Sequence, residues 1–218
     1  MKEITKTYVV YNYDELNKEG KKKALEEACR ILTEIRDEHL EEDLFEEAYN
    51  KYNLNPDFLF YSLSYSQGDG LCFILKNVLS YTRLKDSLYG TGSLDRLNVF
   101  EKAISELDKE RQGVVLEYLN SDYNISIKKI SWHYEHCRTC DFEWEYYKND
   151  NASKEDQVNK VIEELCSHTG LLRKVYDEAC DHLEKLGYEI GYPSEEDTEE
   201  FIEENEYVFL EDGSIFSE

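Results

Sequence analysis

Acidic residues gather in two segments of this 218-residue chain, and any fold that it adopts has to accommodate them. Residues 186–218 contain twelve carboxylates and no Lys or Arg, and residues 37–50 contain seven acids and no base. Together they supply nineteen of the negative charges behind a formal net charge of −24 at pH 7. Charges this close repel each other and weaken a compact state. We therefore interpret both segments as a recognition feature, for which we expect a positively charged partner surface.

The rest of the composition indicates a folded protein. Apolar residues make up 40% of the chain and aromatic residues 13%, whereas disordered chains are poor in aromatics. A chain of this length can bury a substantial core. We expect a core domain over residues 1–187, with an acidic helix and hairpin over residues 188–218 packed on it or appended to it.

The sequence also predicts where the protein acts and what it does not bind. No apolar run is long enough to span a bilayer, and residues 1–6 lack the apolar stretch of a signal peptide. We therefore expect a cytoplasmic protein with six reduced cysteines. DNA, RNA and anionic membranes would repel its acidic surface, so we expect no direct binding to nucleic acid or membrane.

Hydrophobic spacing predicts helices over residues 14–52, 97–119 and 153–186, the last divided at Gly170 and stopped at Gly187. The buried face of the first region is expected to comprise Leu25, Ala28, Leu32, Ile35 and His39. The same stripe is expected to continue through Leu44, Ala48 and Tyr52, on a second helix after a bend.

Alternating apolar and polar residues predict strands over residues 58–66 and 71–77. Gly68 and Gly70 suit a hairpin turn between them, because such turns need a positive φ angle. A further short strand is expected over residues 8–11.

A second hairpin is expected to pair residues 124–135 with residues 141–148 about Arg138. Residues whose numbers sum to 276 would then lie opposite each other, and Trp132 would face Trp144 in an aromatic ladder. The other face would pair Glu135 with Asp141, His133 with Glu143 and Ser131 with Glu145. The sequence therefore predicts a third acidic patch on this hairpin.

Two N-cap signals mark helix starts in the C-terminal part of the chain. Ser153 precedes Asp156 by three residues, and Ser194 precedes Asp197 by the same spacing, which opens a short acidic helix to about residue 205. A terminal hairpin is expected over residues 207–216. The mixture predicts an α+β fold in which antiparallel hairpins pack with several long helices.

Four candidate zinc ligands fall within eight residues of the second hairpin, namely His133, His136, Cys137 and Cys140. A Cys-x-x-Cys turn is half of a zinc knuckle, but the second ligand pair is missing nearby, so we expect no metal ion. Cys137 beside His136 also has the minimum composition of a nucleophilic thiol, but acidic neighbours raise a thiol pKa. With no recognisable catalytic motif, we expect neither enzymatic activity nor a cofactor.

The terminal acidic helix would carry two parallel rows of carboxylates, spaced about 6 Å apart along each row. Duplex DNA presents phosphates every ~3.4 Å per strand, so flexible side chains in two rows can imitate part of a phosphate track. The residues expected to bind a partner are Glu195, Glu196, Glu199, Glu200, Glu203 and Glu204, then Asp37, Glu38, Glu41, Glu42, Asp43, Glu46 and Glu47, with Tyr207 and Phe209 as apolar anchors. The alternative is a solvated face or a frayed acidic tail.

Three short strings of residues carry a family resemblance. They are Tyr61-Ser62-Leu63-Ser64-Tyr65-Ser66-Gln67-Gly68-Asp69-Gly70-x-x-Phe73, the early Tyr11-x-Tyr13-Asp14-Glu15-Leu16, and the closing Glu206-Tyr207-x-Phe209-x-Glu211-Asp212-Gly213. They resemble small uncharacterised proteins encoded by bacteriophages and mobile elements. The resemblance implies a bacterial host cell and a phage setting, in which acidic anti-CRISPR and anti-restriction inhibitors recur. It supplies no catalytic residues.

We therefore expect a phage inhibitor of a host defence complex that targets nucleic acid. Its expected partner is the basic nucleic-acid channel of a host protein or ribonucleoprotein, occupied by carboxylates that imitate phosphates. One alternative is an inhibitor or adaptor that binds through aromatic and helical surfaces. Another is a metal-dependent enzyme built on the His133–Cys140 hairpin or on the loop of Asp69.

Overall fold

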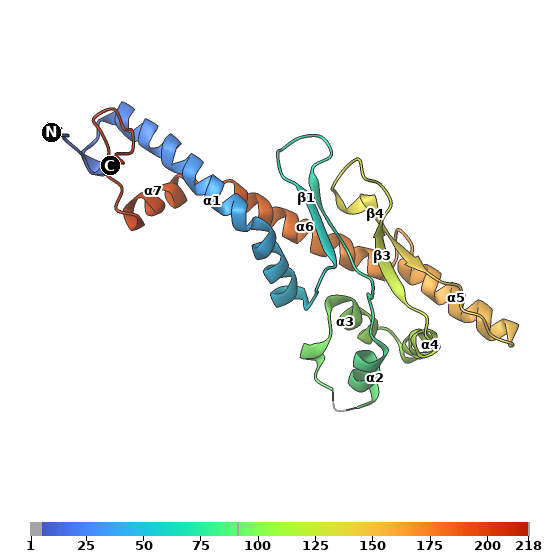
Figure 1. Ribbon diagram of the computed structural model, residues 1–218. Helices are drawn as coiled ribbons and strands as arrows, with labels where there is room; N and C mark the ends of the chain where they lie inside the picture. Colours follow the sequence, from blue (N-terminus) through green and yellow to red (C-terminus); the bar gives the residue numbers. More distant parts are fainter. Residues whose placement is uncertain (1–5, 91, 218) are drawn as a thin grey trace, which may run out of the picture. The chain divides into compact units, whose positions relative to one another are not determined.

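The computed structural model describes residues 6–90 and 92–217 (Figure 1). It has an α+β fold, as predicted, with two antiparallel two-stranded sheets among helices. The elements in chain order are η1 (Tyr13–Glu15), α1 (Lys18–Tyr52), β1 (Phe58–Ser62), β2 (Gly70–Ile74), α2 (Tyr81–Tyr89), η2 (Leu94–Arg96), α3 (Val99–Ser105), α4 (Lys109–Asn120), β3 (Ile125–Lys129), η3 (Cys137–Thr139), β4 (Cys140–Trp144), α5 (Ala152–Cys166), α6 (Leu171–Gly191) and α7 (Glu195–Glu204). No helix in the described ranges is long and apolar enough to cross a membrane.

The chain divides into two compact units. Unit 1 comprises Met1–Leu40 and Tyr188–Glu218, and unit 2 comprises Glu41–Gly187. The first forty residues fall in the same unit as the C-terminal segment, whereas the sequence prediction grouped them with residues 41–187. The physical reason is that the start of α1 supplies the apolar surface on which the C-terminal segment packs.

Unit 1 has a small core of its own, formed by Leu16, Ala24, Ala28, Ile202 and Phe209. Tyr11 and Phe209 exchange two backbone hydrogen bonds of 2.8 and 2.9 Å, so the strand expected over residues 8–11 is reduced to a single bridge. The terminal turn is also tied to α1, because a Cβ atom on Gly213 would lie 2.1 Å from the Gly20 carbonyl oxygen.

Helix α1 is one continuous helix, without the bend expected before Leu44. Its buried apolar positions are Ala24, Ala28, Leu32, Leu40, Leu44 and Ala48. They recur at multiples of four residues, and each four-residue step advances about 40° around the helix, so the buried stripe winds around it. The straight stripe that we expected is wrong at Ile35, which is 44% exposed, and at His39, which is also exposed.

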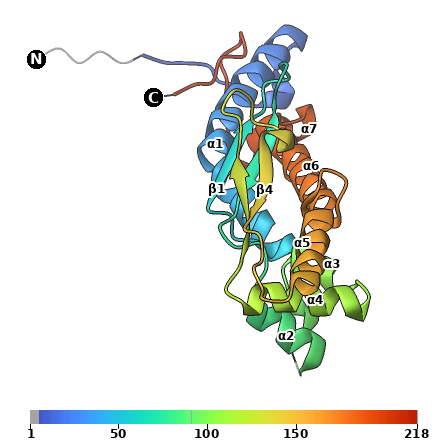
Figure 2. The same cartoon turned by 90° about the vertical axis from the view of Figure 1, so that its right-hand side faces the viewer.

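The first predicted hairpin of unit 2 is confirmed, with β1 paired antiparallel to β2. A single bridge between Leu75 and Ile127 joins this hairpin to β3, which pairs with β4, and the strands lie side by side in both views (Figures 1 and 2). Helix α6 packs on the strands through Tyr176, whose hydroxyl donates to the Phe73 carbonyl oxygen at 3.0 Å. The same hydroxyl accepts from the Phe73 amide at 3.2 Å.

The second hairpin forms with a different register. The residue numbers of paired positions in β3 and β4 sum to 269 instead of 276, so Ile125 faces Trp144 and Ile127 faces Phe142. The predicted aromatic ladder is therefore absent, and Trp132 is 74% exposed. Residues 130–139 form a long connection between the two strands. At its base, the Thr139 carbonyl oxygen accepts hydrogen bonds from the backbone amides of residues 130 and 131.

The new register also removes the third acidic patch. Lys128 lies opposite Asp141 and forms an ion pair with Glu143, and Lys129 forms an ion pair with Glu135. These carboxylates face lysines across the sheet and its connection, instead of facing one another as the expected register required.

Three predicted helix boundaries are wrong, two of them because a different residue caps the helix. Asp108 caps α4, so the region over residues 97–119 is divided into α3 and α4. Asn151, rather than Ser153, caps α5 through its side-chain oxygen. Helix α6 continues through Gly187 to Gly191, whereas the predicted break at Gly170 is confirmed.

Candidate functional site

Helix α7 begins and ends where the sequence predicts. Ser194 is its N-cap and accepts from the Asp197 amide at 3.1 Å, while the Asp197 carboxylate accepts from the Ser194 amide at 2.8 Å. Acidic residues in the first turn also interact favourably with the helix macrodipole. The acidic segment is therefore an ordered helix of unit 1.

The orientation of α7 is set by its apolar side. Thr198 and Ile202 are buried, and Phe201 is half-buried against the core of unit 1. At about 100° per residue, the opposite side of the helix carries every fourth residue from position 196. The two predicted carboxylate rows therefore differ in their surroundings. The row opposite the buried side, called the outer row, is Glu196, Glu200 and Glu204. The row nearer the buried side, called the inner row, is Glu195, Glu199 and Glu203.

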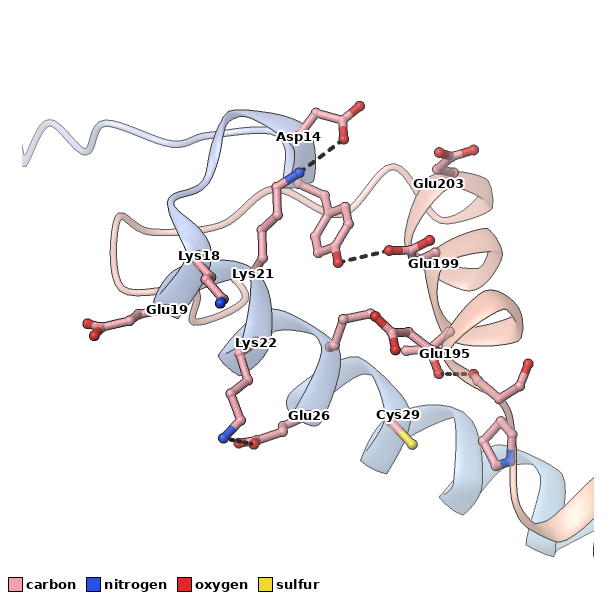
Figure 3. Close-up of a pocket in the computed structure, with 15 residues that line it drawn as sticks. Asp14, Lys18, Glu19, Lys21, Lys22, Glu26, Cys29, Glu195, Glu199 and Glu203 are labelled. Atoms are coloured by element: carbon pink, nitrogen blue, oxygen red, sulfur yellow. Dashed lines mark hydrogen bonds and ion pairs between the residues drawn. The ribbon is translucent and has the colours of Figure 1, made fainter.

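The inner row lines a groove of about 1140 Å³ between α7 and the start of α1 (Figure 3). Lysines 18, 21 and 22 of α1 also line this groove. Lys21 and Lys22 each form an ion pair with an acid of the N-terminal segment, Asp14 at 3.3 Å and Glu26 at 3.6 Å. The inner carboxylates therefore share their groove with positive charge, which weakens their field toward an outside partner.

Tyr13 anchors the inner row from within the groove. Its hydroxyl donates to Glu199 Oε1 at 3.1 Å. Burial, followed by the hydrogen bond to Glu199, raises the pKa of Tyr13 to about 12, so the phenol stays protonated and remains a donor. Glu199 is therefore committed to a contact within unit 1.

The outer row faces solvent. All three of its side chains are exposed, and none has an ion pair or side-chain hydrogen bond among the described residues. Asp197, on the other flank of the helix, is instead held at 3.2 Å by Arg36. The inner row is exposed as well, but it lines the groove that also holds lysines, so the outer row is the one that presents its charge away from them.

The two predicted apolar anchors are not both available. Phe209 has no exposed surface, and its ring belongs to the core of unit 1. Tyr207 is half-buried, with its ring centroid 5.6 Å from that of Phe201. The structure corrects the prediction for Phe209, because the C-terminal segment needs its ring to attach to α1.

The acids predicted along α1 are mostly exposed. Within unit 1 these are Asp37 and Glu38, and within unit 2 they are Glu41, Glu42, Asp43 and Glu46. Glu47 differs, because its carboxylate lies 2.8 Å from His182 Nε2 and 3.9 Å from Lys51 Nζ. Glu47 is thus held inside unit 2.

The four candidate zinc ligands do not assemble into a site. Within residues 6–90 and 92–217, no three His, Cys, Asp or Glu side chains are grouped so as to hold a metal ion. Cys140 is buried, while His136 stacks on Tyr134 with ring centroids 5.9 Å apart. Burial, and then the charge of Asp177, raises the pKa of Cys137 to about 11, which opposes its action as a nucleophile.

The serine-rich motif before Gly70 forms a closed loop around Asp69. The Asp69 carboxylate accepts from the backbone amides of Ser64 and Ser66, at 2.7 and 2.6 Å, and from the Ser62 hydroxyl at 2.7 Å. The Ser66 amide and the Ser62 hydroxyl hold the pKa of Asp69 well below its usual range. Asp69 therefore stabilises its own loop, which leaves little of the carboxylate for a cation.

Sequence reasoning missed the lysines that line the groove. Four lysines fall within residues 18–23, which is a detectable basic cluster beside the acidic segments, but nothing in the sequence places it against α7. No family model, curated protein or solved structure matches this chain. The arrangement of the α7 carboxylates is therefore the main structural indication of function.

Proposed function

We propose that this protein is a non-enzymatic inhibitor that docks the outer row of α7 onto a basic nucleic-acid-binding surface. The proposed partner is a host defence protein or ribonucleoprotein of the anti-CRISPR or anti-restriction target class, in the cytoplasm of a bacterial cell. The phage setting rests on the motif resemblance. The single observation that carries the binding proposal is an ordered helix with a solvent-facing row of unpaired carboxylates.

An ordered acidic helix suits such binding better than a disordered acidic tail. Its carboxylates are already spaced by the helix, so less conformational entropy is lost when the partner binds. Adjacent carboxylates of the row lie about 6 Å apart along the axis, and a basic groove that holds phosphates would attract them. Electrostatic steering would accelerate association and make it fall as salt concentration rises.

The two rows of α7 provide a matched test. The outer variant carries Glu196→Gln, Glu200→Gln and Glu204→Gln, and the inner variant carries Glu195→Gln, Glu199→Gln and Glu203→Gln. Both remove three charges from the same helix, so they alter the net charge equally. Inhibition is measured as target-DNA cleavage by purified CRISPR effectors and restriction endonucleases, across a range of salt concentrations.

We expect the outer variant to lose at least ten times more inhibitory potency than the inner variant, about 1.4 kcal/mol of binding free energy. Equal potency of the outer variant and the unmodified protein would contradict binding through this row. Failure of the unmodified protein to inhibit every nuclease in the panel would contradict the defence-complex assignment.

A second mode of binding is favoured by an exposed aromatic surface on unit 2. Phe58 and Trp132 are both largely exposed, and they flank Phe60 with ring-centroid distances of 6.3 and 5.6 Å. Exposed aromatic clusters mark many interaction sites. A Trp132→Ala variant that loses inhibition, together with binding that is insensitive to salt, would favour this mode over the outer row.

A further inference from the structure

Lys129 is a buried lysine in unit 2 that the acidic recognition surface does not use. Its side chain is 1% exposed. The ammonium group pairs with Glu135, donates to the Tyr134 carbonyl oxygen at 3.2 Å and lies 4.4 Å from the centroid of the Phe60 ring. Its remaining contact is with Cys72 Sγ, at 3.3 Å. A buried charge of this kind persists only when its partners compensate for desolvation.

Cys72 Sγ lies among polar groups. Besides the ammonium of Lys129, the Thr139 hydroxyl oxygen lies 3.5 Å from it, with the hydroxyl proton donated to the His136 carbonyl oxygen at 2.7 Å. The thiol of Cys140 also hydrogen-bonds to it. Both cysteines are fully buried, and the register of β3 and β4 brings Cys140 opposite Lys129. A sulfur that receives hydrogen bonds from two donors, one of them a cation, is stabilised as the thiolate.

The two thiols differ in acidity. The hydrogen bond from Cys140, together with the charge of Lys129, outweighs burial and lowers the pKa of Cys72. The same hydrogen bond, together with burial, raises the pKa of Cys140. Cys72 is therefore the more acidic thiol of the pair and Cys140 the one that keeps its proton, which is the arrangement of an attacking cysteine and a resolving cysteine.

We propose that Cys72 and Cys140 form a peroxide-reactive pair that closes an intramolecular disulfide. The Cys72 thiolate attacks one oxygen of hydrogen peroxide, the O–O bond breaks, and the departing hydroxide takes a proton from solvent to become water. Cys140 then attacks the sulfur of the resulting sulfenic acid. The S–O bond breaks as the S–S bond forms, and the proton of Cys140 leaves with the hydroxyl group as a second water molecule.

Residues 130–136 lie outside any helix or strand, and Tyr134 and Glu135 in this segment contact the ammonium group of Lys129 beside the pair. Segments of this kind open locally at a lower free energy than the whole fold. Hydrogen peroxide is close to water in size, so a small opening admits it. The other buried cysteines provide internal controls, because burial raises the pKa of Cys166 to about 12 and also raises that of Cys180.

The test treats the folded full-length chain with hydrogen peroxide, alkylates the remaining thiols and maps them by mass spectrometry. We expect linked peptides containing Cys72 and Cys140 with two hydrogen atoms lost, while Cys166 and Cys180 are alkylated. Free thiols at Cys72 and Cys140 after treatment would overturn the proposal, as would oxidation confined to the partly exposed Cys29.

Variants separate the roles of the groups. In Cys140→Ser, the sulfenic acid on Cys72 should persist and be trapped by a dimedone probe. In Lys129→Met, oxidation of Cys72 should slow at neutral pH and recover at higher pH, because the thiolate loses its counter-ion. Lys129→Gln serves the same purpose if Lys129→Met does not fold, and Cys137→Ser is the matched control expected to behave like the unmodified chain. A Lys129→Met rate profile identical to that of the unmodified protein would contradict the counter-ion role.

Discussion

At the scale of single residues, charged side chains in this protein acquire partners in two ways. Asp69 finds its donors within seven residues of itself, so a serine at every second position before it suffices to form the loop. Lys129 instead meets Cys72, which lies fifty-seven residues away in the sequence. The first kind of contact can be read from sequence spacing, whereas the second exists only after the strands have paired.

The Asp69 loop gives a prediction about pH. We expect Asp69→Asn to accelerate hydrogen exchange at the amides of Ser64 and Ser66, because a neutral amide oxygen accepts more weakly than a carboxylate. The pKa of Asp69 is lowered by the fold, so its stabilising effect is present above the ordinary value of 3.8 and disappears as the pH falls through the lowered pKa. Exchange measured by mass spectrometry at neutral pH should therefore differ between the two proteins, and the difference should shrink in strong acid.

Asp150→Asn is the control for this experiment, because Asp150 is also an exposed acid in a turn of unit 2 and makes no contact with the loop. Unchanged exchange at Ser64 and Ser66 in Asp69→Asn would contradict the role given to the carboxylate.

At the scale of elements, most of the wrong predictions concern the periodicity of apolar residues along a helix or the register of two paired strands. The apolar residues of α1 fit a straight stripe that includes Ile35, but the true stripe passes through Arg36, whose guanidinium pairs with Asp197. The predicted aromatic ladder failed because an odd change in register places the opposite face of a strand toward its partner. Local patterns do not distinguish these alternatives.

Helix capping provides a prediction at this scale. Ser194→Ala should lower the free energy of unfolding by about 1 kcal/mol, because the Asp197 amide at the start of α7 loses its acceptor. Ser153→Ala should have little effect, although the same spacing precedes an acid there, because Asn151 caps α5. Urea unfolding followed by circular dichroism measures both, and equal effects of the two substitutions would contradict the assigned caps.

At the scale of the whole molecule, the net charge of −24 produces electrostatic repulsion that opposes the compact state. Attachment of the C-terminal segment is supported by ion pairs such as Lys23–Asp212 at 2.6 Å, but exposed pairs of this kind each contribute little. Repulsion among the many unpaired carboxylates therefore opposes compactness more than the surface pairs favour it.

We consequently expect the melting temperature to rise when sodium chloride is increased from about 0.01 to 0.1 M, because the Debye length falls from about 30 to about 10 Å. Calorimetry at fixed pH measures the change. The outer variant, with three fewer charges on α7, should show a smaller rise. A melting temperature that falls with added salt would mean that surface ion pairs outweigh the repulsion.

The sequence by itself determined the α+β class, the hairpin at Gly68 and Gly70, and the capped acidic helix that begins after Ser194. Each of these depends on residues within a few positions of one another, so propensity and turn chemistry are sufficient. Tertiary structure alone decided that the outer and inner rows of α7 differ and that Lys129 meets Cys72 and Cys140. These outcomes depend on how distant segments pack, because burial, strand register and the proximity of charges are properties of the folded chain.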